Sequence, residues 1–160
     1  MTELSGTIQH YNLWVLLHHV SDIIFNARQT ELMRYGIPGM QGEVLFAIKA
    51  IGNPATPAQI SRLMFRRPHS VSGILIRMEK AGLVKRSKDL EKKNLVRVTL
   101  TEKGERAYRQ VLKGRAVQRI VSSLSESERR RLRSLLETLR NKGLKELGLD
   151  PERVPYPKFV

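Results

Sequence analysis

Cysteine is absent from the 160 residues of the sequence. This absence excludes disulfide bonds, thiolate catalysis, thiol-based redox sensing, and zinc or iron–sulfur centres held by cysteine. Long apolar stretches are also missing, because no run approaches the roughly 18 residues that a transmembrane helix requires. The first residues show neither a basic region nor a cleavable apolar segment, so we expect a cytoplasmic protein.

Acidic residues are scarce relative to basic ones. The chain has 15 Asp and Glu against 29 Lys and Arg, which gives a formal net charge of +14 at pH 7. An excess this large favours a polyanionic partner over an acidic protein surface or a neutral metabolite alone. Hydrophobic residues make up 41% and charged residues 28%, which are ordinary values for a globular protein.

Apolar residues recur at helical spacing in both outer parts of the chain. The spacing predicts a long amphipathic helix from Thr7 to Arg34, a second helix from about Pro38 to Ile51, one helix from Thr101 to about Leu124, and a last helix that ends near Leu147. The apolar stripes of the outer helices exceed what the middle of the chain can cover. We therefore expect them to pack against a second copy.

The middle of the chain has the pattern of a helix-turn-helix followed by a hairpin. Thr56 to Gln59 has the residues of a capping box with proline at the first helical position, and this helix runs to about Met64. The next helix opens at Pro68 and has an apolar stripe made of Val71, Ile74, Leu75 and Met78. Two short strands, Leu83–Arg86 and Leu95–Leu100, flank a charged turn.

The predicted fold class is mostly α with a small β-hairpin, namely a winged helix-turn-helix flanked by long dimerisation helices. We expect four regions: an N-terminal dimerisation helix at 1–36, the winged helix-turn-helix DNA-binding region at 37–104, C-terminal dimerisation helices at 105–147, and an extended tail at 148–160.

Positive charge is concentrated in the middle region. Between Arg62 and Arg97 there are eleven basic and three acidic residues, a balance of +8 that exceeds half of the charge excess of the whole chain. The basic residues coincide with the second helix and the hairpin, which are the parts of a winged helix-turn-helix that meet DNA. The charge therefore predicts binding to double-stranded DNA.

The face of the second helix opposite its apolar stripe is small and polar. Its small residues let the helix approach base edges, and Arg77 could bond a guanine or a phosphate through two nitrogens. Arg66 and Arg67 suit phosphates better than bases. The predicted DNA-binding residues are Arg66, Arg67, His69, Ser70, Ser72, Gly73, Arg77, Lys88, Lys92, Lys93 and Asn94.

Some residues of this region have more than one interpretation. The serines are also ordinary residues for the start of a helix. Ile76, on the same face, either touches a thymine methyl group or packs under the hairpin. Asp89 would be repelled by DNA, so we expect it to hold a neighbouring Lys or Arg or to shape the turn. The basic hairpin tip, which includes Lys93, is expected over the adjacent minor groove.

These segments resemble the MarR family of winged-helix transcription regulators. The resemblance depends on three stretches: TPAQISRLM, HSVSGILIRMEKAGLVKR and SKDLEKKNLVRVTLTEKG. The family pattern has a recognition helix ending in LEKxGLVxR, a wing with an Asp and paired basic residues, and a strand closing with LTxxG. The chain departs from the pattern at the wing tip, where Lys92-Lys93-Asn94 stands in place of Asp-Arg-Arg, and at Phe65, where a small residue is usual.

The resemblance implies a homodimer whose two recognition helices enter successive major grooves of a pseudo-palindromic site. It also implies a repressor that a small phenolic or lipophilic ligand releases from DNA. Some members sense peroxide through cysteine, which this chain cannot do. A sequence-tolerant architectural DNA-binding protein and a protein-interaction module without DNA binding are the alternatives.

The remaining candidate sites lie on the first helix. Tyr11, Trp14 and His18 share one aromatic face, which is either part of the dimer core or a ligand pocket, and the dimer core is favoured. His18 and Asp22 have metal-ligand spacing, but two ligands are too few for zinc, so we expect no metal and no cofactor. The sequence shows no nucleophile–base pair, paired carboxylates or phosphate loop, so we expect no enzyme activity.

Overall fold

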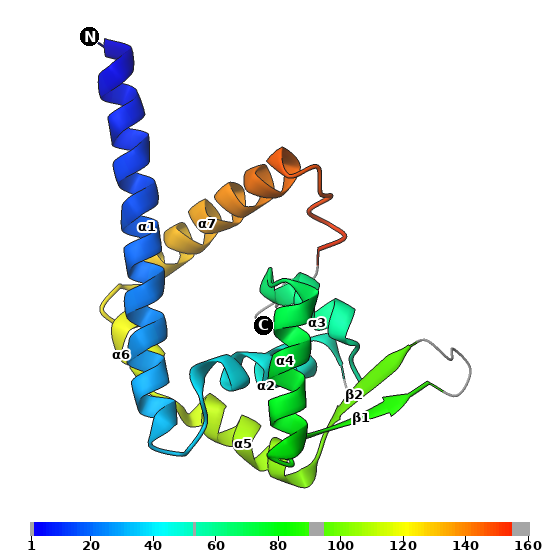
Figure 1. The fold of residues 1–160 in the computed structure, drawn as a ribbon. Coiled ribbons are helices and arrows are strands. Elements are labelled where there is room, and N and C mark those ends of the chain that lie inside the picture. Colours follow the sequence, from blue (N-terminus) through cyan, green and yellow to red (C-terminus); the bar gives the residue numbers. More distant parts are fainter. Residues whose placement is uncertain (1, 53, 90–94, 155–160) are drawn as a thin grey trace.

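The computed structural model describes residues 2–52, 54–89 and 95–154, with side chains from residue 6 onward. The helices of this part are α1 (Thr2–Met33), α2 (Gly39–Ile51), α3 (Pro57–Met64), α4 (Pro68–Lys80), α5 (Glu102–Lys113), α6 (Ala116–Val121) and α7 (Glu126–Glu146), and its strands are β1 (Val84–Lys88) and β2 (Val96–Leu100). Figure 1 shows α1 projecting beyond the rest of the molecule, while the hairpin projects from the side away from α1.

The core lies in the middle region, where α2, α3, α4 and α5 surround the base of the hairpin. Val71, Ile74, Leu75 and Met78 are buried, so the predicted apolar stripe of α4 is confirmed. β1 and β2 pair antiparallel with Val84 opposite Leu100. Ala55 adds a bridge to Val98, which ties the segment before α3 to the hairpin. The predicted mostly helical winged helix-turn-helix is thus confirmed.

Capping boxes begin α3, where one is predicted, and α7. The Thr56 hydroxyl accepts from the backbone N–H of Gln59 at 3.3 Å, and the Gln59 side chain accepts from the Thr56 N–H at 2.9 Å. Ser125 and Glu128 make the same exchange at the start of α7. These reciprocal bonds satisfy backbone donors that the first turn of a helix leaves unpaired.

The single helix predicted from Thr101 to about Leu124 is wrong. The chain leaves helical geometry at Gly114, which separates α5 from α6. The apolar spacing continues through the break, so periodicity could not reveal it. Two smaller differences concern ends: α1 begins at Thr2 rather than Thr7, and β1 reaches Lys88 rather than Arg86.

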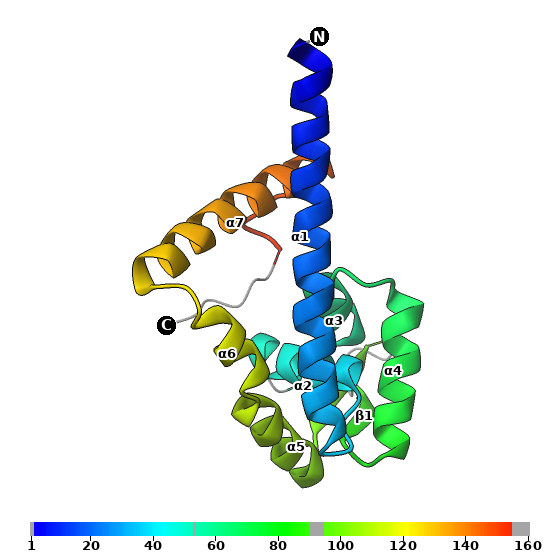
Figure 2. The same ribbon diagram turned by 90° about the vertical axis from the view of Figure 1, so that its left-hand side faces the viewer.

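The outer helices leave wide apolar faces uncovered. Only the C-terminal part of α1 packs on the body, against α2 and α6, while α7 leaves the body obliquely (Figure 2). The apolar stripe of α7 is exposed within one chain, and so is most of the apolar side of α1. The exposed large apolar residues on these helices are Ile8, Tyr11, Leu13, Trp14, Leu16, Leu17, Val20, Ile23, Met33, Leu132, Leu135, Leu136 and Leu139.

The segment after α7 turns back instead of extending. Asp150 accepts a backbone bond from Arg153 at 3.1 Å, and Arg140 of α7 donates to the carbonyl of Val154 at 3.0 Å. Leu144 is buried next to this turn. The described part of the predicted extended tail, residues 148–154, is therefore folded, and residues 155–160 lie outside the described residues.

Candidate nucleic-acid interface

The turn between α3 and α4 is fixed by local hydrogen bonds. Phe65 adopts a left-handed backbone conformation with φ of 50°. The Ser61 hydroxyl then donates to the carbonyl of Arg66 at 2.5 Å, and the Arg66 N–H donates to the Ser61 carbonyl at 3.1 Å. Ser61 is buried, so these bonds hold the turn and orient the start of α4. The family's small residue at this turn is thus replaced by an exposed phenylalanine in a strained conformation.

The polar face of α4 is accessible, as predicted. His69, Ser70 and Arg77 are exposed, and Ser72 and Gly73 are half-buried between them. Gly73 lies beside the Arg77 side chain, since a Cβ built on Gly73 would be in ordinary van der Waals contact with Arg77 Nη1, at 3.7 Å. This part of α4 therefore presents a guanidinium, two hydroxyl groups and a glycine, which suits contact with base edges.

Ile76 lies on this accessible face and is 40% exposed. A contact with a thymine methyl group and packing under the hairpin, whose tip lies outside the described residues, both stay predictions for this residue.

The hairpin contributes a second cationic element. Lys88 is exposed at the end of β1, while Lys92, Lys93 and Asn94 lie outside the described residues. Asp89 accepts from Arg97 Nε at 2.7 Å, and its side chain is only 13% exposed. The expectation that Asp89 holds a neighbouring basic residue is confirmed.

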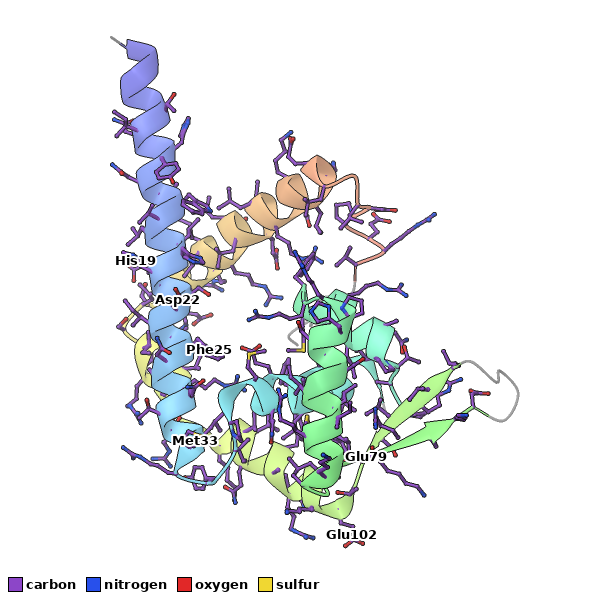
Figure 3. The ribbon with its side chains drawn as sticks, viewed as in Figure 1. His19, Asp22, Phe25, Met33, Glu79 and Glu102 are labelled. Atoms are coloured by element: carbon purple, nitrogen blue, oxygen red, sulfur yellow. The ribbon has the colours of Figure 1, made fainter. Side chains whose placement is uncertain are left out.

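A second acidic residue in this region is neutralised in the same way. Glu79, near the end of α4 (Figure 3), accepts from Arg86 Nε at 2.8 Å and from the Arg86 backbone N–H at 3.0 Å. The hydrogen bond from the Arg86 side chain is the main reason why the pKa of Glu79 lies below its usual range. The pair also connects α4 to β1, so it fixes the hairpin relative to the recognition helix.

Seven other basic side chains of this stretch are exposed and make no ion pair within the described part of the chain. They form what we call the cationic edge: Arg62, Arg66, Arg67, Arg77, Lys80, Lys85 and Lys88. Of the three acids in this stretch, the two that the structure describes do not offset this positive charge, because Glu79 pairs with Arg86 and Asp89 with Arg97. An uncompensated positive surface of this kind attracts nucleic-acid phosphates.

The Arg66 side chain also contacts α2. Its Nη2 lies 4.0 Å from Sδ of Met40 on α2, and its positive charge is near enough to act on the Glu43 carboxyl. Burial raises the pKa of Glu43, although the charges of Arg28 and Arg66 oppose this rise. Arg66 thus joins the cationic edge to the junction between α1 and α2.

Two cavities at this junction were not predicted from the sequence. They share Arg28 and Glu43, and have volumes of about 460 and 410 Å³. The first is lined chiefly by α1 and also by Met40 and Arg66. The second is more apolar and is lined by Arg28, Glu43, Phe46, Ala47, Leu63, Met64 and Val117. The lining residues come from four helices, so no local sequence signal marks them.

The aromatic face predicted on α1 is present but uncovered. Trp14 stacks on His18 with ring centroids 5.9 Å apart, and Tyr11 lies 5.2 Å from Trp14. His18 Nε2 lies 3.8 Å from the Asp22 carboxylate. No group of three or more His, Asp or Glu that could hold a metal occurs among the described residues.

The described helices also include none that is long and apolar enough to cross a bilayer.

Comparison with known proteins decides the family. A model described as MarR family matches residues 35–89. A solved organohalide-sensing transcriptional regulator, RdhR, in its 2,4-dichlorophenol-bound form is 34% identical, with 84% of this chain and 81% of that chain covered and a TM-score of 0.76. The chain belongs to the MarR family. The ligand-free form of the same regulator is 31% identical over 94% of this chain and 90% of that chain, with a TM-score of 0.79.

More distant MarR-family structures agree in fold. A mutant of E. coli MarR complexed with operator DNA is 23% identical, with 80% of this chain and 93% of that chain covered and a TM-score of 0.74. The S. aureus MepR–DNA complex is 21% identical, with 80% and 96% covered and a TM-score of 0.72. No curated protein matches the chain. Members of the MarR family are transcription regulators, and the winged helix-turn-helix of this chain is their DNA-binding fold.

Proposed function

We propose that the protein is a sequence-specific, dimeric repressor that binds a pseudo-palindromic DNA site and is released by a small aromatic ligand. The observation that supports DNA binding most strongly is the cationic edge, whose seven exposed basic residues adjoin the accessible face of α4. The two acids that the structure describes between Arg62 and Arg97, Glu79 and Asp89, are paired with Arg86 and Arg97 and so leave these seven cations free to meet phosphates.

Dimerisation through α1 and α7 is supported by their uncovered apolar faces. Isolated apolar residues at a surface are ordinary, but each of these two helices exposes several large apolar residues at helical spacing, which is typical of an interaction surface. A second copy supplies the same two faces, so the interface would be self-complementary. The predicted dimer core then includes Tyr11, Trp14 and His18, which would be covered by the partner. We retain a ligand contact at these three residues as the second interpretation.

Ligand control is supported by the cavities at the junction between α1 and α2. The related RdhR regulator is known in a form bound to 2,4-dichlorophenol. A cavity of about 410 Å³ lined by Phe46, Leu63 and Met64 has a suitable size and apolar lining for such a ring. Arg66, a proposed phosphate contact, lines the adjoining cavity. A ligand bound at this junction would therefore disturb the position from which the Arg66 side chain contacts a phosphate.

Selection from a pool of randomised DNA tests sequence-specific binding. We expect two half-sites of opposite orientation, and binding that falls steeply with salt at a log–log slope of about −0.9 per phosphate neutralised. Enrichment of no sequence would favour the architectural alternative. Absence of any salt-sensitive DNA binding would favour the protein-interaction alternative.

Substitutions on α4 and on the hairpin separate base reading from phosphate attraction. Arg77→Ala is expected to reduce the preference for the selected site over scrambled DNA, whereas Lys88→Ala or Lys93→Ala should weaken binding to both. Equal losses on both DNAs for all variants would contradict the assignment of Arg77.

Release by ligand is tested by titrating 2,4-dichlorophenol into the protein–DNA complex. We expect dissociation, and we expect Val117→Phe to weaken this response because its ring would fill the cavity. Circular dichroism, and DNA binding measured without 2,4-dichlorophenol, control for the folding of the variant. An unchanged response would move the ligand site away from this cavity.

A further inference from the structure

The break between α5 and α6 is held by a side chain from α1. The carboxylate of Glu31 accepts from the backbone N–H of Arg115 at 3.0 Å and from that of Ala116 at 2.9 Å, one bond to each oxygen. Arg115, at the cap position of α6, makes no side-chain capping bond of its own. Glu31 therefore supplies the missing cap from 84 residues earlier in the sequence.

The Glu31 carboxylate lies close to the backbone at the break and is largely shielded from solvent. The Glu31 side chain is 17% exposed, and Ala116 is buried against it. A Cβ on Gly114 would lie 3.1 Å from Glu31 Oε2, so the break brings the backbone as near as a glycine allows. Arg119 contributes less, because its guanidinium is 3.9 Å from the carboxylate. The Ala116 N–H bond is the main cause that lowers the pKa of Glu31, so the group stays charged at neutral pH.

The elbow formed by Gly114 and Arg115 connects two parts of the molecule. Before it, α5 packs on α2 and belongs to the DNA-reading region. After it, α6 packs on α1 and leads into α7 (Figure 2). Glu31 attaches this elbow to the end of α1 that also turns into α2. Besides the packing of α2 and α6 on α1, the Glu31 carboxylate is therefore a polar link between the reading region and the outer helices.

We propose that Glu31 is a positioning residue that fixes the angle between the reading region and the outer helices and so determines the half-site spacing that the dimer accepts. The inference rests on the proposed dimeric DNA binding. Two recognition helices on one duplex must be separated by about one helical turn, or roughly 34–36 Å. Loosening the elbow would let that separation vary without altering any DNA contact.

The test measures affinity for DNAs in which the selected half-sites are moved apart or together by one and two base pairs. Wild-type protein should prefer one spacing sharply. Glu31→Gln and Glu31→Ala should reduce that preference by about tenfold, as expected for the loss of a charge-assisted hydrogen bond, while their affinity for a single half-site stays within about twofold.

Glutamine is informative because it matches glutamate in size. Its amide offers one oxygen and directs an NH2 group at a backbone donor, so it cannot accept both bonds. Glu102→Gln, which changes an exposed glutamate at the start of α5, is the matched control. Arg119→Ala should leave the spacing profile nearly unchanged.

The outcomes are distinguishable. A wild-type protein that selects no paired half-sites would overturn the proposed function itself. If wild type shows a sharp optimum and Glu31→Gln keeps it, the positioning role is wrong. Equal losses on single half-sites and on every spacing would show that Glu31 supports the reading region instead, and would also overturn the proposal.

Discussion

The proposed dimer can be disrupted by shortening two leucines of α7. Leu135 and Leu139 are 55% and 51% exposed in the single chain, so about half of each side chain remains to be covered by a partner. Full burial of a leucine is worth about 1.5–3 kcal/mol, so covering the remaining half contributes about 1 kcal/mol. Leu135→Ala with Leu139→Ala removes four such side chains from a symmetric dimer, a loss of about 4 kcal/mol or a roughly thousandfold rise in Kd.

Sedimentation velocity over a range of concentrations measures this change directly. The fold of each protomer should survive, because alanine favours the helical state at exposed positions. Leu112→Ala is the matched control, since Leu112 is 56% exposed but lies on α5. An unchanged dimer constant for the double variant would refute the reasoning. So would an equal loss for the control.

Three further predictions concern stability and are measured by urea denaturation followed by circular dichroism. Gly104→Ala should destabilise by about 3 kcal/mol or more, because its Cβ would overlap the carbonyl oxygen of Leu83, whereas Gly143→Ala in α7 meets no atom and should gain about 0.5–1 kcal/mol. A tolerated Gly104→Ala would contradict this packing. Thr56→Ala should cost about 1 kcal/mol through loss of its capping box, and no change would show that Gln59 alone satisfies the turn. The Ala116 N–H bond lowers the pKa of Glu31, so the charged Glu31 carboxylate stabilises the fold fully above the unfolded pKa, and this stabilisation is lost as pH falls through the folded pKa. Between about pH 6 and pH 3, Glu31→Gln should therefore lose less stability than wild type. Parallel plots of stability against pH for the two proteins would contradict this.

Local signals predicted the reading region well. The residue types at Thr56, Pro57 and Gln59 determine a helix start through bonds within four residues, and the structure has that start. The stripe from Val71 to Met78 marks the buried side of α4 for the same reason: helical period and burial are both local. The role of Asp89 could be foreseen because carboxylates near DNA need a cationic partner.

Features that depend on distant contacts could not be predicted. The elbow at Gly114 interrupts a continuous apolar pattern, and its cause, Glu31, lies in another helix. Helical spacing predicted an apolar stripe on the last helix, but a periodic pattern does not say which surface covers that stripe. Arg66 was assigned to phosphates from its position, while its contact with Met40 and its approach to Glu43 arise from packing between α2 and the turn after α3.

Methylation interference at guanine N7 on the selected DNA is the most direct test of two copies that each place α4 in the major groove. The account predicts two clusters of interfering guanines on one face of the duplex, with centres about one helical turn apart, and loss of contacts within each cluster in Arg77→Ala. Interference confined to one cluster, or none in the major groove, would contradict it.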